Sequence, residues 1–316
     1  MAHPEIHAPT EQSIARAADI LRAGGLVAFS TETVYGLGAD ATDARAVAGI
    51  FEAKRRPSFN PLISHVANIE AALALGVFSK TARLLADKFW PGPLTLVVPR
   101  TPDCPIARLT SADLDSVALR VPAHPIAHRL LTAVGRPIAA PSANISGRVS
   151  PTTAAHVASE FEDGVELVLD GGPTEHGLES TVIDVTGEVP TLLRPGSVTR
   201  EMIEELIGPI EIAGEGSPIA APGMLASHYA PSLPVRLNAD APRDGEIFLG
   251  FGALPAGAEG LTLSTDKDLR EAAANLFAMM RELDQPGSTA IAVAPIPKTG
   301  LGQAINDRLR RSAAPR

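Results

Sequence analysis

Apolar residues in the first 207 positions form short continuous runs, separated by segments in which they recur every third or fourth residue. Short runs bounded by glycine or proline are typical of buried strands, and longer periodic segments of amphipathic helices. Strands are therefore expected at residues 26–29, 62–66, 94–99, 117–121, 138–140, 167–169, 181–185 and 191–194. Helices are expected at residues 11–23, 43–54, 69–75, 80–89, 124–134, 152–161 and 201–207.

The first two helices also carry local start and stop signals. Thr10 and Asp43 can cap them, and Gly24 and Pro57 follow their ends. A polar loop containing glycine is expected at residues 30–40. Strands and helices are interspersed without strict alternation, so we expect an α/β fold with a twisted mixed β-sheet covered by helices.

The pattern also predicts how the chain is divided. Residues 208–233 show little periodicity and are rich in Pro, Gly, Ser and Ala, which indicates a linker. Strands are again expected at residues 235–237, 247–250, 261–263 and 291–294, with helices near 269–283 and 301–310. We therefore expect one domain over residues 1–207, a linker over 208–233 and a small α/β domain over 234–316.

Composition narrows the class of protein. The 316 residues are 45% apolar and carry a formal charge of −9, which disfavours general nucleic-acid binding. A single cysteine, Cys104, excludes an internal disulfide and a zinc site of several cysteines. The N-terminus has no apolar signal segment, and the uncharged stretch 216–235 contains four prolines. We expect a cytoplasmic protein without a membrane span.

Polar residues cluster where predicted strands end, although the common phosphate-binding and zinc-binding fingerprints are absent. Residues 30–38 combine hydroxyls, a carboxylate and glycines, residues 54–65 begin with three cations, and residues 141–152 carry small hydroxyl and amide groups. Arg120 and Arg194 each interrupt an apolar strand. Such clusters at strand ends can bind phosphates and a small polar substrate without a covalent nucleophile.

Each cluster also has a purely structural interpretation. Cations at a helix C-terminus satisfy the helix dipole, and a Ser/Asn segment can simply cap a helix. A buried arginine needs an anionic partner, which an internal Asp or Glu can supply. Only the combination of clusters favours a ligand site.

The ordered motifs make the sequence recognisable. They are S-T-E-T-V-Y-G-L-G (30–38), K-R-R-P-S-F-N-P-L-I-S-H (54–65), F-W-P-G-P-L-T (89–95), A-L-R-V-P (118–122), P-S-A-N-I-S-G (141–147), L-E-S-T-V-I-D (178–184) and L-R-P-G (193–196). The linker adds P-G-M (222–224) and H-Y-A-P (228–231). With these motifs the chain resembles the YrdC-like family, in its long, two-domain threonylcarbamoyl-AMP synthase form.

The resemblance implies a YrdC-like catalytic domain, a linker that contributes to the active site and a small Rossmann-like C-terminal domain. It implies a nucleotidyltransferase that forms threonylcarbamoyl-AMP and pyrophosphate from L-threonine, bicarbonate or CO₂, and ATP, for tRNA threonylcarbamoyladenosine modification. Mg²⁺ is expected to be held through the ATP phosphates, without metal ligands from the protein. Both free diffusion of the product and its handover to the tRNA threonylcarbamoyl-transfer machinery stay open.

Residue roles follow from the same resemblance. The expected catalytic residues are Lys54, Arg56, Ser142 and Asn144. The expected ATP-binding residues are Arg56, Asn60, Ser116, Asn144, Thr152, Arg194 and Tyr229. The expected threonine-binding residues are Thr33, His65, Arg120, Ser142 and Ser180, with Thr181 as a second candidate beside Ser180. The family usually has a small residue where this chain has Arg55, which we expect to face solvent. Tyr229 is expected to act as part of a lid over the nucleotide.

Three other functions compete with this one. A non-enzymatic RNA-binding module is disfavoured by the negative charge and the scarcity of aromatic residues. Carbamoyl transfer in a hydrogenase-maturation protein is excluded, because that architecture needs cysteine-rich zinc segments. A YrdC-like ATPase that uses a different amine substrate stays open.

Overall fold

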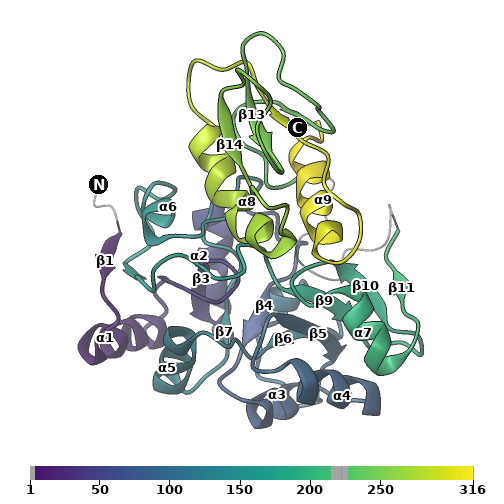
Figure 1. The fold of residues 1–316 in the computed structure, drawn as a ribbon. Coiled ribbons are helices and arrows are strands. Elements are labelled where there is room, and N and C mark those ends of the chain that lie inside the picture. The colour runs from purple at the N-terminus through teal and green to yellow at the C-terminus, as the bar shows by residue number, and fades with distance from the viewer. Residues whose placement is uncertain (1–3, 215–221, 223–226, 316) are drawn as a thin grey trace.

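The computed structural model describes residues 4–214, 222 and 227–315. Within them the chain forms a large sheet flanked by helices and a smaller α/β unit that carries the C-terminus (Figure 1). The expected mixed α/β class is confirmed. The expected linker, 208–233, includes residues 215–221 and 223–226, which lie outside the described residues.

The large sheet is mixed, as the irregular order of elements predicted. The described residues give it eleven strands in the order β1-β8-β2-β3-β7-β4-β6-β5-β9-β10-β11. Strand β4 pairs with β6 in parallel, whereas β5 pairs with β6 antiparallel. The strands are β1 (Glu5–His7), β2 (Val27–Phe29), β3 (Gly36–Asp40), β4 (Ile63–His65), β5 (Leu94–Pro99), β6 (Ser116–Arg120), β7 (Ile138–Ala139), β8 (Leu167–Leu169), β9 (Thr181–Asp184), β10 (Thr191–Arg194) and β11 (Glu211–Ile212).

Strand β3 corrects the sequence prediction, which placed a loop over residues 30–40. Residues Gly36–Asp40 pair with β2 and β7 and are fully buried. Glycine is unfavourable in strands, but a Cβ on Gly38 would lie 2.9 Å from the Phe29 ring. Gly38 therefore lets the Phe29 ring pack on the strand. The edge strands β1 and β11 were missed because their exposed residues form no apolar run.

Helices cover both faces of the sheet. They are α1 (Glu11–Arg22), α2 (Ala44–Lys54), α3 (Ile69–Leu75), α4 (Lys80–Phe89), α5 (Pro125–Val134), α6 (Ala154–Ala158) and α7 (Arg200–Ile207). Thr10 Oγ1 accepts a hydrogen bond from Ser13 N at 3.1 Å, and Asp43 Oδ1 accepts one from Arg45 N at 2.8 Å, so both predicted caps are confirmed. Helix α6 is shorter than the predicted 152–161, because it begins after its N-cap Thr153 and ends before its C-cap Ser159.

The alternation of strand side chains divides the core between the two faces. Val27 and Phe29 of β2 pack in one cluster with α1 and α5, whereas Ala28 packs in the other with α2 and α4. Successive residues of a strand point to opposite faces, so a three-residue apolar strand can serve both. This burial on both faces explains the continuous apolar runs in the sequence.

The C-terminal unit contains a four-stranded sheet in the order β12-β15-β13-β14 among the described residues, with parallel pairing throughout. Its elements are β12 (Val235–Arg236), β13 (Glu246–Gly250), β14 (Gly260–Thr262), α8 (Leu269–Leu283), β15 (Ala290–Val293) and α9 (Leu301–Ser312). One hydrophobic cluster joins α8 and α9 to Val34, Leu178 and Tyr229. The two units therefore share packed apolar surface. None of the helices described is both long and apolar enough to cross a membrane.

Candidate functional site

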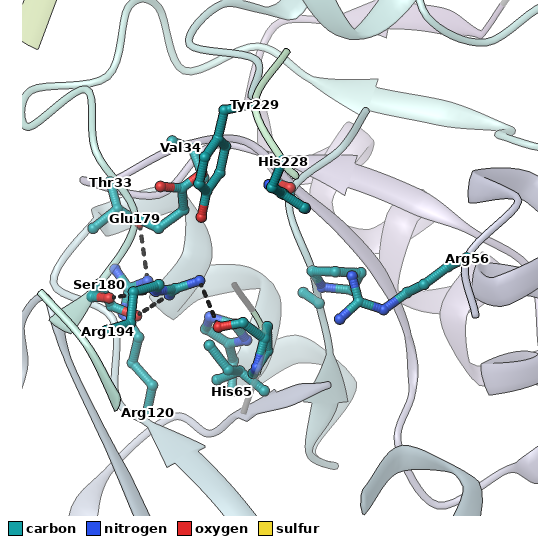
Figure 2. A pocket seen from close by; sticks show the side chains of 15 residues that line it. Thr33, Val34, Arg56, His65, Arg120, Glu179, Ser180, Arg194, His228 and Tyr229 are labelled. Carbon is teal, nitrogen blue, oxygen red and sulfur yellow. Dashed lines mark hydrogen bonds between the residues drawn. The ribbon is translucent and has the colours of Figure 1, made fainter. Parts of the chain in front are cut away.

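A cavity lies where several strands of the large sheet end, beside the segment that carries His228 and Tyr229 (Figure 2). His65, Arg120 and Arg194 are the last residues of β4, β6 and β10. About 470 Å³ of the cavity and of the solvent at its mouth is free of protein atoms. Its lining residues are Thr33, Val34, Arg56, Ile63, His65, Arg120, Ala140, Pro141, Ser142, Glu179, Ser180, Arg194, Pro222, His228 and Tyr229. Its position matches the usual place of ligands in α/β proteins, at the carboxyl ends of strands.

Two arginines bring positive charge to this cavity without a carboxylate partner among the described residues. Arg56 donates from Nη2 to the Pro61 carbonyl at 3.0 Å, and Arg194 donates from Nε to the Ser180 carbonyl at 3.0 Å. Both side chains are buried. Burial and the charge of Arg194 lower the pKa of Arg56 to about 9. Two buried guanidinium groups held only by neutral acceptors form a site for an anion.

Arg120 differs because an internal carboxylate neutralises it. Its Nη2 donates to Glu32 Oε1 at 2.6 Å and its Nη1 to Thr33 Oγ1 at 2.9 Å. Burial alone would raise the pKa of Glu32, but Arg120 holds that pKa below its ordinary value. The buried pair fixes the Thr33 hydroxyl at the cavity. The sequence analysis expected an internal Asp or Glu as a possible partner of a buried arginine, and for Arg120 this partner is Glu32.

Several buried polar atoms of the described residues have no hydrogen-bond partner. Three belong to residues that line the cavity: His65 Nδ1, His228 Nδ1 and the Tyr229 hydroxyl, which points into the cavity in Figure 2. Both amide atoms of Asn60 and Oδ1 of Asn144 are also unpaired. An unpaired buried polar group is unfavourable by about 1–3 kcal/mol, so a cluster of them indicates a ligand that supplies the partners.

The two cavity histidines are neutral. Burial, followed by the charge of Arg120, lowers the pKa of His65 to about 3. Burial and the charges of Arg56 and Lys54 hold the pKa of His228 well below its ordinary value. The positive charge of the cavity therefore comes from its arginines and not from its histidines, and an anionic ligand would relieve the repulsion between Arg56 and Arg194.

Lys54 does not line the cavity but supports a loop that does. It is buried at the end of α2, and its Nζ donates to the carbonyl oxygens of Ser142, at 2.6 Å, and Asn144. Burial, followed by the charge of Arg56, lowers its pKa well below the ordinary value. The Asn144 amide donates to the Arg148 carbonyl at 3.0 Å. Lys54 and Asn144 thus fix the loop that presents Ser142 to the cavity.

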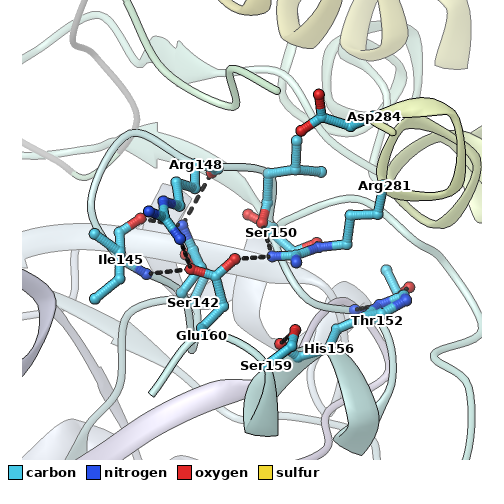
Figure 3. Close-up of polar contacts among 12 residues, drawn as sticks. Ser142, Ile145, Arg148, Ser150, Thr152, His156, Ser159, Glu160, Arg281 and Asp284 are labelled. Atoms are coloured by element: carbon cyan, nitrogen blue, oxygen red, sulfur yellow. Dashed lines mark hydrogen bonds and ion pairs between the residues drawn. The ribbon is translucent and has the colours of Figure 1, made fainter. Parts of the chain in front are cut away.

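The same loop is held from outside by Glu160, just beyond α6 (Figure 3). Its carboxylate accepts from Ile145 N at 3.1 Å and from Arg281 Nη2, on α8, at 2.8 Å. Arg281 also donates to the Val149 carbonyl. The C-terminal unit therefore helps to hold the loop that presents Ser142.

The structure brings together most of the residues singled out from the sequence. Those that line the cavity are Thr33, Arg56, His65, Arg120, Ser142, Ser180, Arg194 and Tyr229. Lys54, Asn60, Ser116, Asn144 and Thr152 do not line it. Ser116 is half-buried at the start of β6, and the Thr152 hydroxyl lies 3.3 Å from His156 Nδ1. Arg55, at the helix end with φ of 51°, is exposed as expected.

Two functional candidates received no role from the sequence. Glu179 lines the cavity beside Ser180. Arg308, on α9, is fully buried and its Nε donates to Glu179 Oε2 at 2.9 Å. The signal for Arg308 was its position three residues after Ile305, on the buried face of a predicted helix. A charged residue on an apolar face is a reason to search for a buried partner.

The fold defines a two-unit α/β protein whose cavity at the strand ends is lined by buried arginines and hydroxyl groups. A family model described as "Telomere recombination" matches residues 19–196, and one described as "Threonylcarbamoyl-AMP synthase, C-terminal domain" matches residues 198–314. The chain belongs to the threonylcarbamoyl-AMP synthase family, as the resemblance predicted.

Curated and solved relatives cover nearly the whole chain. The threonylcarbamoyl-AMP synthase of Pyrococcus abyssi is 45% identical over 96% of this chain and 94% of its own length. The threonylcarbamoyl-AMP synthase of Bacillus subtilis is 41% identical over 97% of this chain and 94% of its own length. The crystal structure of P. abyssi Sua5 complexed with L-threonine has a TM-score of 0.90 at 42% identity, covering 99% of this chain and 97% of that one. The expected two-part YrdC-like fold is confirmed at the level of architecture.

Proposed function

We infer that the protein is a threonylcarbamoyl-AMP synthase that makes threonylcarbamoyl-AMP and pyrophosphate from L-threonine, bicarbonate or CO₂, and ATP. Membership of the family carries the reaction class, since relatives named for this activity match over almost the full chain. The observation that supports ATP is the pair Arg56 and Arg194, which are buried at one cavity without carboxylate partners among the described residues. A triphosphate supplies the anionic charge that this pair lacks.

The proposed reaction needs alignment more than a protein nucleophile. The amine of threonine adds to CO₂ and loses a proton, which gives a carbamate. A carbamate oxygen then attacks the α-phosphorus, the bond from that phosphorus to the bridging oxygen breaks, and pyrophosphate leaves. The barrier falls when the two reactants are held in line and the charge on the phosphates is neutralised.

We propose that the cavity residues divide between the two substrates. Arg56 and Arg194 would hold the triphosphate, with Tyr229 over the nucleotide. The Thr33 and Ser180 hydroxyls and neutral His65 would surround threonine, next to the Arg120–Glu32 pair. Ser180 is oriented for this role, since its Oγ lies 2.8 Å from Thr95 Oγ1 and accepts from Arg194 Nη2 at 3.1 Å. The contact between Ser180 and Arg194 would place the two substrates side by side.

The remaining predicted residues belong to the supporting set in this proposal. Lys54 and Asn144 shape the loop of Ser142, as their hydrogen bonds to backbone carbonyls indicate. Asn60 has both amide atoms buried and unpaired but does not line the cavity, so its contact with ATP stays a prediction from the family resemblance. Ser116 and Thr152 stay predictions from the family resemblance.

We propose that Mg²⁺ accompanies ATP and is held by phosphate oxygens and water. The described residues contain no group of three or more His, Cys, Asp or Glu side chains that could hold a metal ion. The metal would supply charge neutralisation for the leaving pyrophosphate. We further propose a cytoplasmic enzyme whose product serves tRNA modification by other proteins, with no strong binding of tRNA by this chain.

The test is pyrophosphate release by the purified protein with ATP, Mg²⁺ and bicarbonate, measured with each component omitted in turn. Release that requires both L-threonine and bicarbonate supports the proposal. Release without dependence on threonine would indicate a YrdC-like ATPase that uses another amine. Salt-sensitive RNA affinity without any ATP binding would indicate the RNA-binding alternative.

A further inference from the structure

Arg308 joins the C-terminal unit to the cavity through buried polar contacts. It lies on α9, is 0% exposed, and donates to Glu179 Oε2 at 2.9 Å and to the Pro195 carbonyl at 2.6 Å. Its guanidinium carbon also lies 5.4 Å from the centre of the Tyr229 ring. One side chain from outside the large sheet thus contacts three segments of the cavity wall.

These three segments carry candidate substrate contacts. Glu179 precedes Ser180, and Pro195 follows Arg194. The two segments pass very close to each other, because a Cβ on Gly196 would lie 2.6 Å from the Glu179 carbonyl oxygen. A shift of either segment would therefore move Ser180 and Arg194 together.

The negative charge of Glu179 links the Arg308 contact to the binding of an anionic substrate. The Glu179 carboxylate lines the cavity and also accepts from Ser150 Oγ at 2.5 Å. Burial alone would raise the pKa of this carboxyl, but Arg308, Arg194 and the Ser150 hydroxyl together hold it below its ordinary value. An ionised carboxylate in this wall would repel an anionic substrate if Arg308 did not compensate it.

We propose that Arg308 is a positioning residue through which the C-terminal unit completes the substrate cavity: it neutralises Glu179 and fixes the segments that carry Ser180, Arg194 and Tyr229. The inference rests on the proposed function, because it assumes that the cavity binds ATP. It assigns to the C-terminal unit a part in substrate binding beyond stabilising the fold.

The test compares Arg308→Met, Glu179→Gln and the double variant by steady-state kinetics on the full chain. Removing Arg308 takes away the ion-pair partner of the buried Glu179 carboxylate and leaves it only the Ser150 hydroxyl and the nearby charge of Arg194, so KM for ATP should rise by at least about tenfold, with kcat changed much less. In the double variant the carboxylate is gone as well. KM should then return to within about threefold of the unaltered protein, a strong non-additivity.

Arg281→Met is the matched control. Arg281 also reaches the large sheet from the C-terminal unit through a buried ion pair, with Glu160 at 2.8 Å, but it does not line the cavity. Because Arg281 also supports the loop of Ser142 through Glu160, we expect its loss to lower the melting temperature and to raise KM for ATP far less than Arg308→Met does. If Arg308→Met is too unstable to assay, Arg308→Lys is compared with the double variant instead. Lys keeps the charge but not the geometry of the guanidinium, so KM for ATP in Arg308→Lys should rise less than tenfold above that of the unaltered protein.

The outcomes separate the two claims. If the unaltered protein is active but Arg308→Met leaves KM for ATP unchanged, or the double variant is no better than Arg308→Met, the positioning role is wrong. If Arg281→Met raises KM equally, the effect comes from docking of the two units and the assignment to Arg308 is also wrong. If the unaltered protein releases no pyrophosphate with threonine, the proposed function fails first, and this inference fails with it.

Discussion

The Tyr229 hydroxyl provides a sharp test of the cavity, because it is buried and has no hydrogen-bond partner among the described residues. The Tyr229 ring is well packed: its centre lies 5.4 Å from that of Phe277 and 4.1 Å from that of His228. Tyr229→Phe keeps these ring contacts and removes only the hydroxyl. It therefore separates a role in folding from a role in binding.

The two effects of Tyr229→Phe should have opposite signs. Burying an unpaired polar group is unfavourable by about 1–3 kcal/mol, so the ligand-free variant should be more stable by up to that amount. For a chain of this size that corresponds to a rise of roughly 1.5–4.5 °C in Tm. A hydrogen bond to a charged group contributes about 1.5–3 kcal/mol, so loss of one to a phosphate should weaken ATP binding roughly 10- to 150-fold.

Tyr35→Phe is the matched control, since the chain has only two tyrosines. Tyr35 is also buried, but its hydroxyl donates to the Gly172 carbonyl at 2.8 Å and accepts from Gly171 N at 3.1 Å. Its loss should destabilise the protein by about 1–3 kcal/mol. Thermal unfolding and ATP titration of both variants form the assay. If Tyr229→Phe were destabilised as much as Tyr35→Phe, or bound ATP normally, the hydroxyl would not be reserved for a ligand.

Three further predictions follow from other contacts. Glu32→Gln should destabilise the protein by about 3–5 kcal/mol in denaturant unfolding, because it leaves Arg120 buried without its carboxylate; a loss under about 1 kcal/mol would contradict the buried pair. The pKa of His65 is lowered from 6.5 to about 3, so the unfolded chain binds a proton that the folded chain does not, and stability falls as pH drops from 6.5 towards 3. His65→Gln should flatten this dependence by up to about 1.4 kcal/mol per pH unit in denaturant melts at a series of pH values, and an unchanged slope would refute the assignment. Tyr229→Ala should raise ATP hydrolysis relative to threonylcarbamoyl-AMP formation, as measured by nucleotide chromatography, because it opens the cavity to water; an unchanged ratio would exclude a lid role.

The sequence predicted the regular elements well where local signals were strong. Residues 69–75, 80–89, 167–169 and 269–283 have the predicted bounds, because their periodicity or apolar runs are bounded by caps or turn residues. It failed at Gly36–Asp40, where a tertiary contact with Phe29 overrides the low strand propensity of glycine. The strands missed at Glu5–His7 and Glu211–Ile212 form through backbone pairing at sheet edges, which leaves little trace in the side-chain pattern.

The sequence predicted which residues belong to the candidate site, but not which of them form ion pairs with one another. Motif resemblance singled out Arg56, Arg120 and Arg194, yet it did not show that only Arg120 has a carboxylate partner among the described residues. That difference depends on which side chains the fold brings together. Arg308 lies 129 residues from its partner Glu179, so no local pattern could connect them.

Formation of threonylcarbamoyl-AMP is tested most directly by the identity of the nucleotide product. The purified protein would be incubated with ATP, Mg²⁺, L-threonine and ¹³C-bicarbonate, and the products separated and weighed by mass spectrometry. The account predicts a threonylcarbamoyl-adenylate that carries the single labelled carbon and forms together with pyrophosphate. Unlabelled AMP or ADP as the only nucleotide product, at rates unaffected by threonine, would contradict it.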